Sequence, residues 1–261
     1  MKNKVKSDIP PFKMYGNIYF IGSTRVSVHL IETEVGLVLI DTGYPDMYEQ
    51  ILGSMNELGF NPKDLCAIFH SHGHIDHFGC TQKLKELSGA KTYISYIDND
   101  IVNGKLDLSW AQELGYQRLP TFNCDVLVID GDTFSFGNTT IRCRLTPGHT
   151  DGVLSFFIKT GTEDKTAIAG MHGGVGFNTL TTEFLNKYQL SFRCRDVFKE
   201  SIHKMLDEPV DIVLGNHPQQ NDTQGKLEKV LMGDSIVDHT EWKRFLNNIE
   251  HELDDRIANG I

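Results

Sequence analysis

The chain has 261 residues, of which 39% are hydrophobic and 10% aromatic, and its formal net charge is −10 at pH 7. This hydrophobic content is ample for a buried core, so we expect one large domain or two closely packed halves. The acidic surface argues against partners such as nucleic acid or anionic membranes, and no apolar run is long enough to span a bilayer. The expected partner is a small-molecule substrate.

The N-terminal sequence MKNKVKSDIPPFKMYG is basic but lacks the apolar region and the cleavage site of a signal peptide. We therefore expect a cytoplasmic protein, or a periplasmic or secreted one if a leader has been removed. The five cysteines are scattered and form no CxxC pair. They predict neither a disulfide framework nor a thiolate zinc cluster.

Strands and helices are expected to alternate through the first half of the chain. Runs that favour strands lie at 17–22, 26–33, 36–43, 65–69 and 91–96. One helix is expected after Asp46, which fits a capping box with Glu49, and it ends at Gly59. A second helix is expected at 80–89, and residues 104–123 read as a loop with a short helix.

The pattern restarts after residue 123. Strands are expected at 124–130, 132–137, 139–148, 153–159, 166–170 and 210–215, with a helix at 190–206 and two more at the C-terminus. In the last helix Asp238 and Glu241 fit a capping box. Its apolar stripe comprises Trp242, Phe245, Leu246, Ile249, Leu253 and Ile257. One domain over 1–261, with similar halves at roughly 12–125 and 126–261, predicts two packed sheets with helices outside.

A dense cluster of metal-ligand side chains follows the strand LCAIF. His72, His74, Asp76 and His77 stand within six residues of one another. Neutral imidazole and carboxylate are the ligands that zinc prefers, and three or four of them must converge on one ion. In an extended segment His72 and His74 point to the same side, so they can bind one ion, while Asp76 and His77 can face a second.

Two more histidines follow predicted strands. His149 lies in LTPGHTDG and His217 in VLGNHPQ. Either one alone would be read as an ordinary turn residue. Together they complete two three-ligand sites with open positions for water. We interpret His70 as structural, and we give His172, which follows Met171, little weight as a seventh ligand.

The motifs HSHGHIDH, TPGHTDG, LIDTG and GNHP resemble those of the metallo-β-lactamase superfamily, in order and across nearly the whole chain. The resemblance implies a four-layer αβ/βα sandwich, an α/β (α+β) fold with the metals at one edge between the sheets. It also implies that Asp41, in LIDTG, supports the metal-binding histidines. A plain turn that ends a strand is the other interpretation of Asp41.

Most hydrolases of this superfamily carry a bridging aspartate where this chain has Met171. Methionine is a neutral, soft ligand and does not replace a bridging carboxylate on zinc. The pattern is most similar to the β-lactamase branch with three histidines at one zinc and Asp-His-His at the other. The resemblance thus implies two zinc ions per chain, held by His72, His74 and His149, and by Asp76, His77 and His217.

The expected activity is zinc-dependent hydrolysis of the amide bond of β-lactam antibiotics by metal-bound hydroxide, which Asp76 positions as a catalytic residue. The alternative is a zinc hydrolase of another ester, lactone or thioester, with β-lactam turnover absent or incidental. A redox or non-catalytic relative of the same fold is a third interpretation, which metal analysis would separate from the other two by distinguishing iron from zinc.

Overall fold

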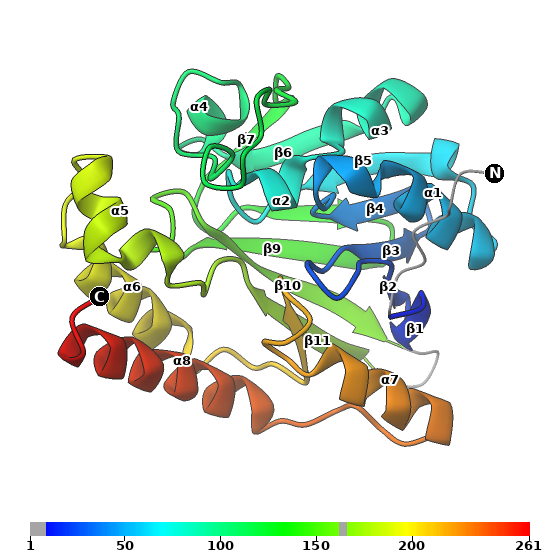
Figure 1. Cartoon of the computed structure of the whole chain (residues 1–261). Coiled ribbons are helices and arrows are strands. Elements are labelled where there is room, and N and C mark those ends of the chain that lie inside the picture. Colours follow the sequence, from blue (N-terminus) through cyan, green and yellow to red (C-terminus); the bar gives the residue numbers. More distant parts are fainter. Residues whose placement is uncertain (1–8, 162–165) are drawn as a thin grey trace.

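Two sheets form the centre of the molecule (Figure 1). The computed structural model describes residues 9–161 and 166–261. The seven-stranded sheet runs in sequence order through β1 (Phe12–Tyr15), β2 (Ile18–Phe20), β3 (His29–Thr33), β4 (Gly36–Ile40), β5 (Leu65–Phe69), β6 (Lys91–Ser95) and β7 (Val126–Val128). The five-stranded sheet has the order β12 (Ile212–Gly215), β11 (Thr166–His172), β10 (Leu154–Gly161), β9 (Thr139–Leu145) and β8 (Thr133–Phe136).

Helices cover the outer face of each sheet (Figure 1). The first sheet is covered by α1 (Tyr48–Glu57) and α3 (Thr81–Ser88), and the second by α6 (Cys194–Met205) and α8 (Glu241–Ala258). Three helices are shorter, α2 (Ile75–Phe78), α4 (Asn99–Val102) and α5 (Thr182–Lys187), and α7 (Thr223–Met232) packs Leu227 into the cluster between the sheets. The expected αβ/βα sandwich is therefore confirmed.

The core between the sheets is aromatic and holds the strand that leads into the histidine cluster. Phe69, the last residue of β5, is fully buried and stacks on Tyr93 with ring centroids 4.3 Å apart. Its edge meets Phe156 of the opposite sheet at 6.0 Å. Burying a side chain of this size stabilises a fold by roughly 1.5–3 kcal/mol. The loop that starts at His70 is thus anchored in the best-packed part of the molecule.

Alternation along β11 fixes which side chains face which layer. Ala167, Ala169 and Met171 point between the sheets, whereas Ile168 packs against the helices outside. On the outer face, a Cβ at Gly170 would come within 2.6 Å of Val210. Met171 is therefore a buried core residue, 1% exposed.

The two predicted capping boxes are wrong. A short 3₁₀ turn at Pro45–Met47 precedes α1, and the Asp46 side chain pairs with Arg25 instead of capping the helix. At α8, Asp238 accepts a hydrogen bond from the backbone of Thr240 at 2.9 Å. Glu241 accepts one from the buried Lys226 at 2.5 Å. In both cases the carboxylate that was expected to cap the helix instead bonds to a side chain distant in sequence or to a local turn.

The predicted apolar stripe of α8 is confirmed. Trp242, Phe245, Leu246 and Leu253 are buried, while Ile249 and Ile257 pack against the same cluster. Trp242 also donates its indole N–H to the carbonyl of Met205 at 2.8 Å. This stripe attaches the last helix of the chain to α6 and the second sheet.

The secondary structure of residues 99–128 differs from the expectation. The short helix lies at 99–102, and residues 104–125 contain no helix or strand. Residues 126–128, expected to open the second half, instead add β7 to the first sheet, because they pair in parallel with β6. β1 was not expected, and it pairs with β2 at the sheet edge.

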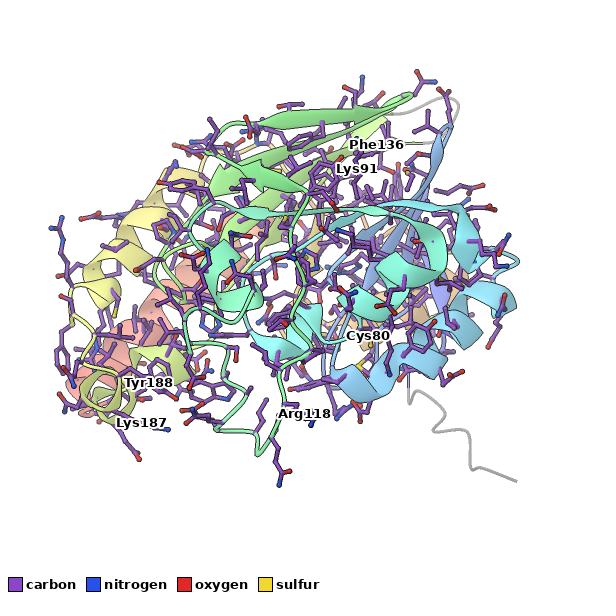
Figure 2. The ribbon with its side chains drawn as sticks, turned by 90° about the horizontal axis from the view of Figure 1, so that it is seen from above. Cys80, Lys91, Arg118, Phe136, Lys187 and Tyr188 are labelled. Carbon is purple, nitrogen blue, oxygen red and sulfur yellow. The ribbon has the colours of Figure 1, made fainter. Side chains whose placement is uncertain are left out.

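The irregular segment 104–125 is attached to α5. Glu113 accepts hydrogen bonds from Lys187 at 2.7 Å and from the Tyr188 hydroxyl at 2.6 Å. Figure 2 shows Lys187 and Tyr188 on one side of the molecule, with Arg118 of the segment projecting outward. Over the described ranges 9–161 and 166–261, no helix is both long and apolar enough to cross a membrane.

Candidate metal centre

The site lies where parallel strands end. β4, β5 and β6 are parallel neighbours, so the residues that follow them meet at one edge of the first sheet. These residues are Asp41, the histidine loop from His70 and the segment before α4. β11 and β12 are also parallel, which brings the segments after His172 and Gly215 together. This edge is where α/β sheets usually bind their ligands.

His72, His74 and His149 converge on one point. His74 Nδ1 lies 3.1 Å from His72 Nε2 and 3.0 Å from His149 Nε2. All three side chains are buried. His149 comes from the loop after β9, in the other sheet, so the fold brings together the two segments that sequence spacing separates by 75 residues. The predicted first group is present.

The hydrogen bonds of this group set the orientation of each ring. His72 Nδ1 lies 2.8 Å from the carbonyl oxygen of Gly173, and His149 Nδ1 lies 2.7 Å from that of Gly176. A carbonyl only accepts, so each Nδ1 carries the proton and each Nε2 presents a lone pair to the centre. A single N–H at His74 Nδ1 can donate to only one of these two atoms. The arrangement therefore fits a cation at the centre better than a set of hydrogen bonds.

Burial keeps these imidazoles neutral, which is the form that binds a metal. Burial holds the pKa values of His72 and His74 well below their usual range, helped by the neighbouring histidines. Burial also lowers the pKa of His149 to about 4. Desolvation disfavours the charged imidazolium, so the lone pairs are available at neutral pH.

Asp76, His77 and His217 form the second group. Asp76 Oδ2 lies 3.4 Å from His77 Nε2 and 3.6 Å from His217 Nε2. His217 Nδ1 donates to the carbonyl of Arg25 at 2.8 Å, so its Nε2 also points a lone pair inward. Within each of the two groups the candidate ligand atoms lie within 4.8 Å of one another.

His77 is the clearest sign that an ion belongs here. Its Nδ1 donates to Asp41 at 2.8 Å, while its Nε2 is buried and has no hydrogen-bond partner among the described residues. A buried polar atom without a partner is costly. Burial lowers the pKa of His77, but the carboxylates of Asp76 and Asp41 outweigh it, and the net shift is upward. A metal ion at Nε2 would satisfy the atom and the local negative charge together.

Asp41 supports the histidine loop from behind. It is 1% exposed and has φ of 62°, a conformation that costs a non-glycine residue energy. One carboxylate oxygen accepts from the Ser71 backbone N–H at 2.7 Å, and the other from the Ser71 hydroxyl at 2.7 Å and from His77 Nδ1 at 2.8 Å. This geometry is more specific than that of a turn that merely ends a strand.

The remaining candidates lie outside both groups. His70 donates to the carbonyl of Tyr93 at 2.9 Å and accepts from Thr81 at 2.7 Å, which agrees with a structural role. His172 is buried beside Phe198, and burial lowers its pKa to about 3. Neither residue is a member of the two groups found among the described residues.

Two pockets adjoin the centre. One of about 240 Å³ is lined by every member of the two groups except His72, and also by Tyr44, Trp110, Asn178 and Asn216. Another of about 290 Å³ shares His74 and His149 with it and is mainly apolar. Its aliphatic and aromatic lining comprises Ile97, Ile101, Leu106, Leu108, Phe184, Leu185, Leu190 and Val197. The site thus has space for a substrate with both polar and apolar parts.

Sequence reasoning missed three residues at this site. Ser71 bridges Asp41 and the loop. Asp98 accepts a hydrogen bond from the backbone N–H of Gly73, between the two candidate ligands His72 and His74. Trp110 has φ of 61° and lies between His74 and Phe184, with centroids 6.2 Å and 5.0 Å away. Trp110 lies in the irregular segment, where no periodic pattern singles it out.

The family model described as the metallo-beta-lactamase superfamily matches residues 21–170, more than half of the chain. The chain belongs to the metallo-beta-lactamase superfamily. The matched region ends at Gly170 and includes five of the six predicted ligands, all but His217.

Solved structures of the superfamily superimpose over almost the full chain. The subclass B3 metallo-beta-lactamase of Bradyrhizobium japonicum is 23% identical, with a TM-score of 0.88 and coverage of 98% of this chain and 97% of that one. The metallo-beta-lactamase of Legionella gormanii is 25% identical, with a TM-score of 0.87 and coverage of 98% of both chains. The first likeness shows the shared fold.

Curated relatives have other names. An N-acyl homoserine lactonase of a Bacillus species is 30% identical over 51% of this chain and 57% of its own length. A probable polyketide biosynthesis zinc-dependent hydrolase of Bacillus velezensis is 31% identical over 42% of this chain and 40% of its own. The chain spans about half the length of the curated relatives that it matches.

Proposed function

We propose that this protein is a zinc-dependent hydrolase that binds two zinc ions and opens the amide bond of β-lactams. The observation that carries the proposal is the pair of three-ligand groups, His72-His74-His149 and Asp76-His77-His217, with a buried Nε2 of His77 that has no hydrogen-bond partner among the described residues. Ligands of this type, three per ion with further positions open, are typical of catalytic zinc sites.

When bound, zinc acts as a Lewis acid and lets water supply hydroxide at neutral pH. The chain's own residues provide the rest. The neutral imidazoles present lone pairs, and their N–H groups are held by the carbonyls of Gly173, Gly176 and Arg25. The Asp76 carboxylate orients the attacking water and accepts a hydrogen bond from it. Orientation of this kind lowers the barrier to attack on the strained amide carbonyl.

Tyr44 is a candidate substrate contact. It lines the pocket above both groups, and burial, with the negative charge of Asp76, raises its pKa to about 12. Its phenol therefore stays protonated and can donate to a substrate carboxylate or carbonyl. The second group, with the neutral third ligand His217, leaves room for the carboxylate that penicillins, cephalosporins and carbapenems carry beside the scissile bond.

No covalent step is needed. Cys194 is the one cysteine that lines the apolar pocket, and burial raises its pKa, so its thiol remains protonated and weakly nucleophilic. Because the proposed hydrolysis depends on zinc and uses no nucleophilic serine, we expect a chelator to abolish turnover and serine-directed inhibitors to leave it unchanged.

The test is purified, zinc-loaded protein against a β-lactam panel and an acyl-homoserine lactone panel. We expect hydrolysis of at least one cephalosporin or carbapenem. His74→Ala should abolish it, while His203→Ala, at an exposed histidine that contacts Glu250, should not. Full activity in His74→Ala would identify the measured activity as a contaminant.

A second candidate is hydrolysis of another ester, lactone or thioester. The mainly apolar pocket of about 290 Å³ beside His74 and His149 favours it, because an aliphatic acyl chain would fit such a lining. The N-acyl homoserine lactonase among the relatives supports the same candidate. Lactone turnover without any β-lactam turnover would establish this candidate over the first.

A further inference from the structure

Asp98 joins the two loops that supply the three-histidine group. It follows β6 and is 1% exposed. Its Oδ2 accepts from the backbone N–H of Gly73 at 2.8 Å and from the hydroxyl of Thr150 at 2.7 Å. Gly73 stands between His72 and His74, and Thr150 follows His149. One oxygen atom therefore connects the segments that carry all three histidines.

Helix capping does not explain this carboxylate. Asp98 occupies the N-cap position of α4, where an aspartate side chain normally accepts from the first turn of the helix. Here the side chain makes no such bond and turns toward the histidine loops instead. The start of α4 thus fixes the position of the Asp98 carboxylate, although the carboxylate makes no capping hydrogen bond to this helix.

The packing around Asp98 leaves little freedom for the two loops. A Cβ at Gly152 would come within 2.3 Å of Asp98 Oδ1, and a Cβ at Gly73 within 2.9 Å of Ile101 in α4. Burial raises the pKa of Asp98 to about 6, although the hydrogen bonds from Thr150 and Gly73 oppose the shift. The fold thus keeps a carboxylate at a position where desolvation disfavours its charge, and both loops depend on its contacts.

We propose that Asp98 is a positioning residue that fixes the His72–His74 loop relative to the His149 loop and so sets the metal affinity of this group. Asp41 has the matching task on the other side, where it holds Ser71 and His77. Asp98 contacts none of the three ligands of the second group among the described hydrogen bonds. Its effect should therefore be confined to the three-histidine group. The inference rests on the metal centre of the proposed function and is independent of the substrate.

The test isolates each three-ligand group before Asp98 or Thr150 is changed. In an Asp76→Ala background, in which the three-histidine group is intact, zinc affinity is measured by competition with a chromogenic chelator. Thr150→Val removes one donor to Asp98, and Thr150→Ser restores it. We expect Thr150→Val and Asp98→Ala to weaken zinc binding by about 10- to 100-fold, the usual effect of removing a group that orients a ligand. We expect Thr150→Ser to bind as the parent does.

A matched control lies two residues away. Asp100, on α4, is partly exposed and pairs with Lys105, so Asp100→Ala should leave zinc affinity unchanged. In a His149→Ala background, which keeps only the second group, Thr150→Val should also have no effect. Visible absorption of Co²⁺-loaded protein gives a second readout, since the band intensities of Co²⁺ report its coordination geometry.

Three results would overturn the inference. One is parental zinc affinity in Thr150→Val and Asp98→Ala. Another is an equal loss in the His149→Ala background, which would indicate general destabilisation. The third is no rescue by Thr150→Ser. Absence of zinc binding in the Asp76→Ala parent itself would instead reject the metal centre and with it the proposed function.

Discussion

Asp41→Asn tests how the second metal group is supported. The amide keeps the size of the carboxylate, and asparagine tolerates φ of 62°, so backbone strain is unchanged. Asp41 receives three donors, from the Ser71 backbone, the Ser71 hydroxyl and His77 Nδ1. An amide has only one acceptor oxygen. Either its NH₂ faces the backbone N–H of Ser71, or it faces His77 Nδ1.

In the second arrangement His77 must move its proton from Nδ1 to Nε2, the atom that faces the metal. Either way the buried site loses a hydrogen bond to a charged group: in the first arrangement the Ser71 N–H has no acceptor, and in the second a neutral bond from the amide replaces the charged one. Such a loss costs about 2–4 kcal/mol of unfolding free energy. We also expect zinc affinity of the second group to fall by about 10- to 100-fold.

Urea unfolding of metal-free protein measures the first effect, and zinc competition in a His149→Ala background measures the second. Asp222→Asn is the matched control. Asp222 also has positive φ, 50°, but it caps α7 at an exposed position far along the chain. Asparagine caps a helix about as well as aspartate, so this change should be close to neutral. A loss below about 0.5 kcal/mol for Asp41→Asn, with unchanged zinc affinity, would refute the reasoning.

Three further outcomes are expected. Burial lowers the pKa of His29 from 6.5 to about 4, so the unfolded chain takes up the proton first and stability falls as pH drops through this range. Between pH 6.5 and about pH 4, the free energy of unfolding of His29→Gln should therefore fall by about 3 kcal/mol less than that of the parent. Urea titrations of the metal-free proteins measure this difference. Met171→Ala should keep both metals by elemental analysis but lose about 2–4 kcal/mol of stability, because Met171 is buried between the sheets. Trp242→Ala should cost about 3–5 kcal/mol in the same unfolding assay, since it removes a buried ring and its bond to Met205.

The sequence by itself determined the kinds of side chain at the centre and most of the strands that carry them. The imidazole cluster directly follows the apolar run LCAIF. A strand that is buried on both faces of a central sheet has such an unbroken run of apolar residues, so the sequence predicts a metal site on a rigid support. The strand within 210–215 and the helix α8 could also be predicted from the sequence, because the spacing of their apolar residues follows directly from which face is buried. The strand positions of His149 and His217 made them candidates for the same reason.

The tertiary structure decided everything that depends on a partner distant in sequence. Asp46 and Asp238 have the spacing of capping boxes, but a cation or a local turn takes each carboxylate. Asp98 looks like an N-cap, and only the fold reveals its contacts with Gly73 and Thr150. Local sequence specifies which groups are available for hydrogen bonding, whereas the packing of the sheets and loops specifies which donor reaches which acceptor. The proposed metal centre combines both: its candidate ligands can be read in the sequence, and their orientation is set by residues that only the folded chain brings near.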